Sequence, residues 1–78
     1  MTQSYNTKSY DYSRLLGKIV EVCGSKRAFS EKMRLSQPTI SKKTNGKVEW
    51  TQTEITEACE ILGIKKNEIH SYFFSTRG

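Results

Sequence analysis

The sequence predicts one small all-α domain, a compact bundle of about five short helices. Apolar residues recur at helical spacing along most of the chain. Residues that begin or end helices separate these segments from one another. A chain of 78 residues is long enough for one small hydrophobic core. We expect residues 11–74 to form the domain, between a flexible N-terminal tail over residues 1–10 and a C-terminal tail over residues 75–78.

The first two helices are predicted from their caps and apolar stripes. Asp11 can act as the N-cap of a first helix, and Gly24 is expected to end it. The apolar positions of this helix recur at the spacing of one face: Leu15, Leu16, Ile19, Val20 and Cys23. Ser25 can cap a second helix, in which Phe29, Ser30 and Met33 face inward.

A third helix is predicted over residues 37–44. The hydroxyl of Ser36 can cap it, and Pro38 fits its first turn because the missing N–H would have no partner within the helix. Asn45 and Gly46 follow, and both residue types tolerate the left-handed backbone that ends a helix.

The most specific local signal comes next. Thr51 and Glu54 form a T-x-x-E capping box, while Trp50 and Ile55 stand at the positions of a hydrophobic staple. The fourth helix carries Ile55, Ala58, Cys59 and Leu62 on one face, and Gly63 is expected to end it. A final short helix carries Ile69, Tyr72 and Phe73.

Several classes of protein are disfavoured by composition. No segment has the run of about 18–20 apolar residues that spans a bilayer, and the N-terminus lacks the apolar stretch of a secretion signal, so we expect a cytoplasmic protein. Cys23, Cys59 and His70 are too few for a metal site of about four ligands. A disulfide is possible on count, but both cysteines lie on apolar stripes and are interpreted as core residues. Without a catalytic grouping or a phosphate-binding glycine loop, we predict no enzyme, no cofactor and no small-molecule ligand.

Positive charge is concentrated in residues 25–47. This segment holds seven Lys or Arg residues and one Glu, a net +6, whereas the rest of the chain has six basic and seven acidic residues. Such a segment can be a solvated surface, or it can attract a polyanion through the release of condensed counterions. A membrane surface would require a strong apolar face on the same helix, which the lysine-rich run lacks.

The same segment, SKRAFSEKMRLSQPTISKKTNGK, resembles the helix-turn-helix of lambda-repressor-like phage regulators, the Cro and repressor family. Ser30 matches the small residue where the two helices approach, and S-Q-x-T-I-S and N-G-K match the start and end of the second helix of the motif. The apolar positions of the motif fall on Phe29, Met33, Leu35 and Ile40. The likeness covers roughly residues 15–73, including E-A-C-E-I-L-G-I in the fourth helix.

Two positions depart from the family pattern. Arg34 stands where the turn usually has glycine, and a non-glycine residue at positive φ costs on the order of 1 kcal/mol, so we expect a slightly remodelled turn. Lys43 stands where an apolar residue usually packs on the other helices. Its methylene stem can cover apolar surface while the amine reaches outward.

The resemblance implies a double-stranded DNA-binding transcriptional regulator, similar to Cro, that reads a palindromic operator through the major groove with the helix over residues 37–44. It implies base contacts from Gln37, Pro38, Thr39, Ser41 and Lys42, with the Gln37 amide suited to adenine and Lys42 to guanine. It implies phosphate contacts from Ser25, Lys26, Arg34, Lys43, Asn45 and Lys47. Such a protein would act in a bacterial cell or a phage-infected host.

Family members usually bind as two-fold dimers, which implies a homodimer here. Tyr72, Phe73 and Phe74 are consecutive, so one helix face cannot bury all three. Tyr72 and Phe74 are the predicted dimer contacts, although Phe74 can instead fold over its own core. Two other classes stay open: an antitoxin-like module whose basic face binds an acidic protein, and an RNA-binding domain, which would need exposed aromatic residues in the basic segment.

Overall fold

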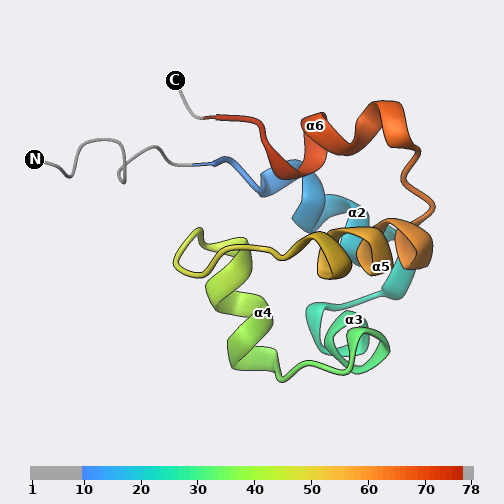
Figure 1. Cartoon of the computed structure of the whole chain (residues 1–78). Helices are drawn as coiled ribbons and strands as arrows, with labels where there is room; N and C mark the ends of the chain where they lie inside the picture. The colour runs from blue at the N-terminus through green and yellow to red at the C-terminus, as the bar shows by residue number, and fades with distance from the viewer. Residues whose placement is uncertain (1–9, 77–78) are drawn as a thin grey trace, which may run out of the picture.

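The computed structural model describes residues 10–76 of the chain. Within this range the chain forms five α-helices and one 3-10 helix, with no strand. In order they are α2 (Ser13–Cys23), α3 (Lys26–Met33), α4 (Gln37–Thr44), α5 (Gln52–Leu62), the 3-10 helix η1 (Lys66–Glu68) and α6 (Ile69–Phe73) (Figure 1). The predicted all-α bundle is confirmed.

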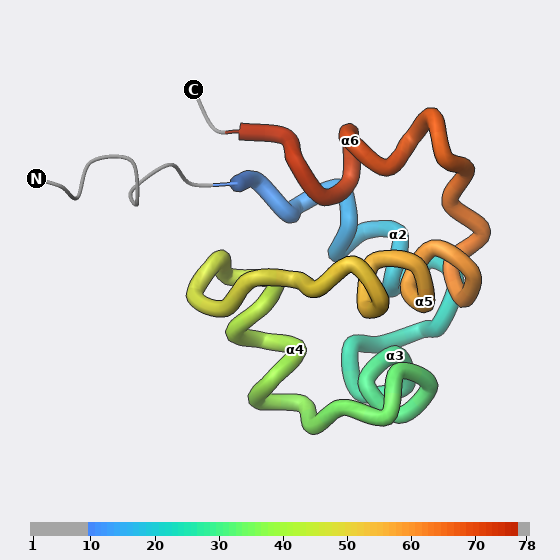
Figure 2. The backbone as a smooth tube through the Cα atoms, viewed as in Figure 1, coloured from blue at the N-terminus to red at the C-terminus, as the bar shows by residue number. Residues whose placement is uncertain are grey.

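α4 lies at one end of the molecule, away from α6. In Figure 1, α6 lies at the top, α5 crosses the middle, and α3 and α4 lie below it. α2 contacts α3, α5 and α6, and α4 packs against α3. The connection from α4 makes a wide turn before it enters α5, as the backbone tube shows (Figure 2). In this layout three residues of α4 remain exposed: Gln37, Pro38 and Lys42.

The two ends of the described chain lie together. Tyr10 and Thr76 form an isolated antiparallel bridge, and the backbone N–H of Asp11 donates to the carbonyl oxygen of Ser75 at 2.7 Å. The predicted tails cover residues 1–10 and 75–78, so most of their length lies outside the described residues. The residues of these segments that are described contact each other.

The start of α2 differs from the prediction by one residue. Tyr12 is its N-cap, without a side-chain capping bond, because the Tyr12 ring is buried and sets where the helix begins. Asp11 lies one position earlier, and its carboxylate accepts hydrogen bonds from the N–H of Ser13 at 2.9 Å and from its hydroxyl at 2.7 Å. Asp11 therefore supports the first turn from outside the cap position.

The predicted caps of α3 and α5 are confirmed. The Ser25 hydroxyl accepts from the N–H of Ala28 at 3.0 Å. In the capping box, the Thr51 hydroxyl accepts from the N–H of Glu54 at 3.1 Å, and the Glu54 carboxylate accepts from the N–H of Thr51 at 3.0 Å. Trp50, just before this box, packs edge-on against Phe73 at 5.2 Å between ring centroids. The start of α5 is thus fixed by hydrogen bonds and by the core.

Every α-helix contributes to one hydrophobic core, with Leu15, Ile19, Phe29, Ile40 and Phe73 as its largest fully buried side chains. Cys59 is buried, and burial raises the pKa of its thiol, which favours the neutral form. Cys23 is half-buried against the core. Val20, predicted on the inward stripe, is exposed, because successive helical residues are rotated by about 100° and Ile19 already points to the centre of the core.

Candidate nucleic-acid interface

The leading edge of α4 is held by its cap. Ser36 is the N-cap, as predicted, and its hydroxyl accepts from the N–H of Thr39 at 3.2 Å. The hydroxyls of Ser36 and Thr39 also lie 2.8 Å apart in a second hydrogen bond. Pro38 occupies the first turn, where it removes an N–H that needs no partner. The backbone of Gln37 and Pro38 is therefore fixed while their side chains stay exposed.

The two sides of α4 have different surroundings. Ile40 and Thr44 are buried, and the Thr44 hydroxyl donates to the Ile40 carbonyl oxygen at 2.9 Å. The predicted base-reading residues lie on the other side: Gln37, Pro38 and Lys42 are exposed, and Thr39 and Ser41 are half-buried. Positions 37, 38, 41 and 42 share one outward helical surface, which we call the reading surface. The structure brings these four together and places the Thr39 hydroxyl against the cap.

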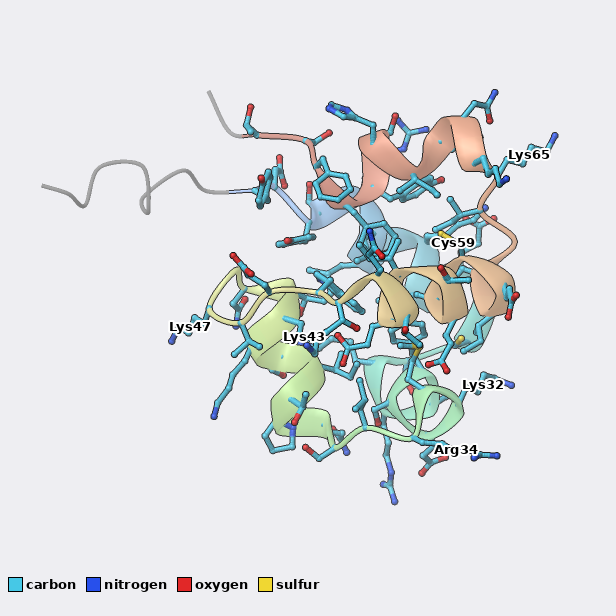
Figure 3. All side chains as sticks on the ribbon, viewed as in Figure 1. Lys32, Arg34, Lys43, Lys47, Cys59 and Lys65 are labelled. Atoms are coloured by element: carbon cyan, nitrogen blue, oxygen red, sulfur yellow. The ribbon has the colours of Figure 1, made fainter. Side chains whose placement is uncertain are left out.

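Five of the six predicted phosphate contacts are exposed. Ser25 and Lys26 lie at the start of α3, where backbone N–H groups and the helix dipole attract anions. Asn45 and Lys47 follow α4, and Lys47 points away from the body of the protein (Figure 3). The fifth is Arg34, between α3 and α4.

Arg34 occupies the turn in a left-handed conformation, with φ 62° and ψ 36°. Its N–H donates to the carbonyl oxygens of Ser30 and Glu31, and the next N–H, of Leu35, donates to Ser30 at 3.0 Å. The expected remodelling of the turn is therefore not observed. The backbone follows the glycine-like path because these bonds satisfy the last carbonyls of α3, and the strain is retained at Arg34.

Asn45 does not adopt the left-handed conformation, although it was predicted as part of the stop after α4. It has φ −98°, whereas Gly46 has φ 78°. Of these two residues, only Gly46 has the left-handed backbone that turns the chain after α4. The N–H of Lys47 then donates to the carbonyl oxygen of Lys42 at 2.8 Å. The side chain of Asn45 stays exposed beside the reading surface.

Lys43, the sixth predicted phosphate contact, lies inside the protein. Only 4% of its surface is exposed. Its ammonium Nζ lies 2.7 Å from Glu54 Oε1 and donates to the carbonyl oxygen of Glu49 at 2.8 Å. Figure 3 shows it between α4 and α5, unlike Lys47. The ammonium that was expected to reach outward is directed inward, because a carboxylate and a carbonyl meet it there.

Glu54 has two tasks that the sequence did not indicate together. It completes the capping box of α5 and pairs with Lys43. Burial alone would raise the pKa of this carboxyl group, but the hydrogen bond from Lys43, the bond from the Thr51 N–H and the charge of Lys43 lower it below its usual value. Glu54 is therefore held as a carboxylate at neutral pH.

The two predicted dimer contacts differ in exposure. Tyr72 is 7% exposed, lies in the core, and has the guanidinium of Arg14 4.9 Å from its ring centroid. Phe74 is 39% exposed, although Tyr10 packs edge-on against it at 5.9 Å between centroids. Of the two aromatic residues, Phe74 presents the larger free surface to a second copy.

A shallow groove of about 380 Å³ lies between the end of α3 and α5. Two basic, two acidic and two apolar residues line it: Lys32, Arg34, Glu57, Glu60, Met33 and Ile61. The amino-acid sequence did not indicate this groove, because its two walls are more than twenty positions apart in the chain. The mixed charge suits a protein surface better than a polyanion.

Two other kinds of site are absent from the described part of the chain. Residues 10–76 contain no group of three His, Cys, Asp or Glu residues that could hold a metal ion. None of the helices described here is long and apolar enough to cross a membrane.

A family model described as "Protein of unknown function (DUF739)" matches residues 8–76. The chain belongs to this family. Its fold is similar to the solution structure of the modulator of repression (MOR) of the temperate bacteriophage TP901-1 from Lactococcus lactis, with a TM-score of 0.75 and 48% sequence identity. The match covers 85% of this chain and 89% of the other. No curated protein matches. The DUF739 family is thus established, while the likeness to Cro and lambda-repressor-like regulators stays a prediction.

Proposed function

We propose that this protein is a phage or prophage regulator that binds double-stranded operator DNA and reads its sequence with α4. The observation that carries the proposal is the reading surface: Gln37, Pro38 and Lys42 are exposed on a helix whose opposite side is buried, within the segment of net charge +6. The 48% identity to a phage modulator of repression supports a regulatory role. The motif at residues 25–47 supports the helix-turn-helix reading of α3 and α4.

The reading surface has groups suited to base edges in a major groove. The Gln37 amide can donate and accept at adenine N6 and N7, and Lys42 can donate to guanine O6 or N7. Pro38 can contact a thymine methyl group, as can the methyl group of Thr39 next to it in the chain, and the Ser41 hydroxyl can act as a donor or as an acceptor. Because Pro38 and the Ser36 cap fix the first turn, these groups are presented with little backbone freedom.

Phosphate contacts from the surrounding residues would hold α4 in register. Ser25 and Lys26 can bind one phosphate at the N-terminus of α3, and Asn45 and Lys47 can bind another beyond the end of α4. Arg34 is exposed on the turn between these helices. Lys43 is left out of this set, because its ammonium is already held by Glu54 and Glu49.

One helix reads only a few base pairs, so we propose a homodimer with two reading surfaces about 34 Å apart on one face of the duplex. The exposed ring of Phe74 is the proposed contact between copies. Such a regulator would act in the cytoplasm of a bacterial cell or phage-infected host, as a binding protein rather than an enzyme.

The test is selection of bound duplexes from a random pool, followed by titration of the selected duplex at several salt concentrations. We expect a two-fold symmetric sequence, tight binding in the presence of competitor DNA, and a linear fall of log K with log salt of about 0.9 per neutralised phosphate. Binding that is equal for all sequences, or absent at low salt, would contradict the proposal.

A second candidate function is supported by the groove between α3 and α5. A protein that modulates repression can act on the operator or on a repressor protein, and the mixed charge of the groove suits a protein surface. Charge reversal of Glu57 and Glu60 should weaken binding to a repressor and leave duplex binding intact. If the reading-surface variant Gln37→Ala weakened repressor binding instead, the groove would not be the site.

A further inference from the structure

Lys43 is a lysine at a buried position of α4. Lys43 lies on the buried side of α4 together with Ile40 and Thr44, and it stands where the family that the sequence resembles has an apolar residue. A buried ammonium is costly unless it is paired and hydrogen-bonded. Here the Glu54 carboxylate lies 2.7 Å away and the Glu49 carbonyl oxygen 2.8 Å away. Burial and both contacts point to a role inside the protein.

The contacts of Lys43 join three consecutive segments of the chain. Lys43 belongs to α4, Glu49 to the connection after it, and Glu54 to the first turn of α5. The ammonium also lies 5.8 Å from the ring centroid of Trp50, which packs on Phe73 of α6. One side chain therefore fixes α4 and its connection against the capped start of α5. We call Lys43, Glu54 and the Glu49 carbonyl the α4–α5 lock.

The lock has a directional property that an apolar side chain would lack. α4 has its main backbone contacts with α3, and the Lys43 side chain is one of its connections to α5. An apolar side chain at this position would only fill space, whereas a buried ammonium also requires its two oxygen acceptors to stay within hydrogen-bonding distance. Buried ionic groups are often no more stabilising than apolar ones of similar volume, and their best-attested use is to specify one arrangement.

We propose that Lys43 is a positioning residue that sets the orientation of α4 through the α4–α5 lock, and so determines how Gln37 and Lys42 meet the bases. The effect of Lys43 on base recognition rests on the proposed function. The lock itself is independent of any ligand. Lys43 lies next to Lys42 in the chain and acts on specificity without touching DNA.

Three single variants and one double variant separate positioning from phosphate binding. Lys43→Met keeps the apolar stem and removes the ammonium. Glu54→Gln keeps the capping box, which accepts glutamine as well as glutamate, and removes the charge. Lys43→Met/Glu54→Gln removes the ion pair without leaving either charge alone. Lys47→Met is the matched control, because Lys47 is an exposed lysine close to the same helix.

The first measurement needs no DNA. Residual dipolar couplings of backbone amides report the orientation of α4 relative to α5 in the free protein. We expect Lys43→Met and Glu54→Gln to change that orientation or broaden its distribution, and Lys47→Met to leave it unchanged. The emission of Trp50, the single tryptophan of the chain, should change in the same two variants. If Lys43→Met does not fold, Glu54→Gln and the double variant carry the test.

The second measurement is binding to the selected duplex and to a duplex altered at the base pair read by Gln37. We expect Lys43→Met to lower the ratio of the two affinities about tenfold, within the range of about 5- to 150-fold that one bidentate base contact supplies. The salt slope should stay at its wild-type value. Lys47→Met should keep the ratio and reduce the slope by about 0.9, the share of one phosphate.

The outcomes distinguish this inference from the proposed function. If the wild-type protein binds no duplex, the proposed function fails, and the dipolar couplings alone decide whether the lock orients α4. If α4 keeps its orientation in Lys43→Met, Glu54→Gln and the double variant, the lock is a packing feature and the inference is overturned. A reduced salt slope in Lys43→Met would also overturn it, because Lys43 would then be a phosphate contact.

Discussion

Lys42 and Lys43 are adjacent in α4 and have opposite surroundings. Lys42 is exposed on the reading surface, whereas Lys43 is 4% exposed and paired with Glu54. Successive residues of a helix are rotated by about 100°, so one step in sequence separates the outer surface from the core. The net charge of a segment therefore differs from the charge that its surface presents. One of the seven basic residues in residues 25–47 is neutralised inside the protein.

The largest expected difference between the inner and outer sides of α4 is in stability. Ile40→Ala should lower the free energy of unfolding by about 2–5 kcal/mol, because Ile40 is fully buried and its removal leaves a cavity. Gln37→Ala, on the outer side, should change it by no more than about 0.5 kcal/mol. Urea denaturation followed by circular dichroism measures both. Similar losses in the two variants would mean that α4 is packed differently.

Within the proposed interface, reading and anchoring residues should respond differently. Gln37→Ala should relax the preference at one base pair of each half-site, at a cost of about 1–3 kcal/mol for the preferred duplex. Lys47→Ala should weaken binding to all duplex sequences by the same factor and reduce the salt dependence of binding. Titrations of matched and altered duplexes at two salt concentrations test both. If the two variants had the same effect on base preference and on salt dependence, the division into base-contacting and phosphate-contacting residues would be wrong.

The inner side of α4 should respond to acid through Glu54. Because the folded pKa of Glu54 is lowered, its contribution is fully present above the unfolded value of about 4.3 and is lost as pH falls through the folded pKa. Glu54→Gln should cost about 1.5–3 kcal/mol near neutral pH, the scale of one charged hydrogen bond, and should flatten the stability curve in acid. Unfolding free energies measured from pH 7 to pH 3 check this.

The control for the acid experiment is Glu57→Gln, which removes an exposed glutamate one turn further along α5. It should keep the wild-type dependence on pH. If Glu54→Gln and Glu57→Gln gave the same curve, the pairing of Glu54 with Lys43 would have no thermodynamic effect.

The smallest expected effect concerns the turn before the reading surface. Arg34→Gly should relieve the left-handed strain at φ 62° and raise the unfolding free energy by at most about 1 kcal/mol. The same variant should weaken duplex binding, since it removes an exposed cation. Denaturation and duplex titration of one sample separate the two effects. A loss of stability would show that the Arg34 side chain supports the fold.

Most of the fold was predictable because its signals are local. Ser25, Ser36 and Thr51 each cap a helix that begins at the next residue, and these caps depend on side chains within three positions. The predicted N-cap of α2 was wrong by one residue. The burial of Tyr12 depends on the assembled core rather than on the sequence near Asp11.

The candidate site was predictable only where helical periodicity decides exposure. Gln37, Pro38 and Lys42 are exposed as predicted. The surroundings of Lys43 were not predictable, because its partner Glu54 belongs to the next helix and its own methylene stem allows either direction. The groove between α3 and α5 was likewise invisible, since its walls meet only in the folded chain.

The proposed function depends on contact between the outer surface of α4 and DNA. Titration of the ¹⁵N-labelled protein with its selected duplex, followed by amide chemical shifts, tests it most directly. We predict the largest changes at Gln37, Ser41 and Lys42 and at the start of α3, with little change at the exposed Val20 of α2. Changes concentrated at Glu57 and Glu60, with α4 unaffected, would contradict the claim.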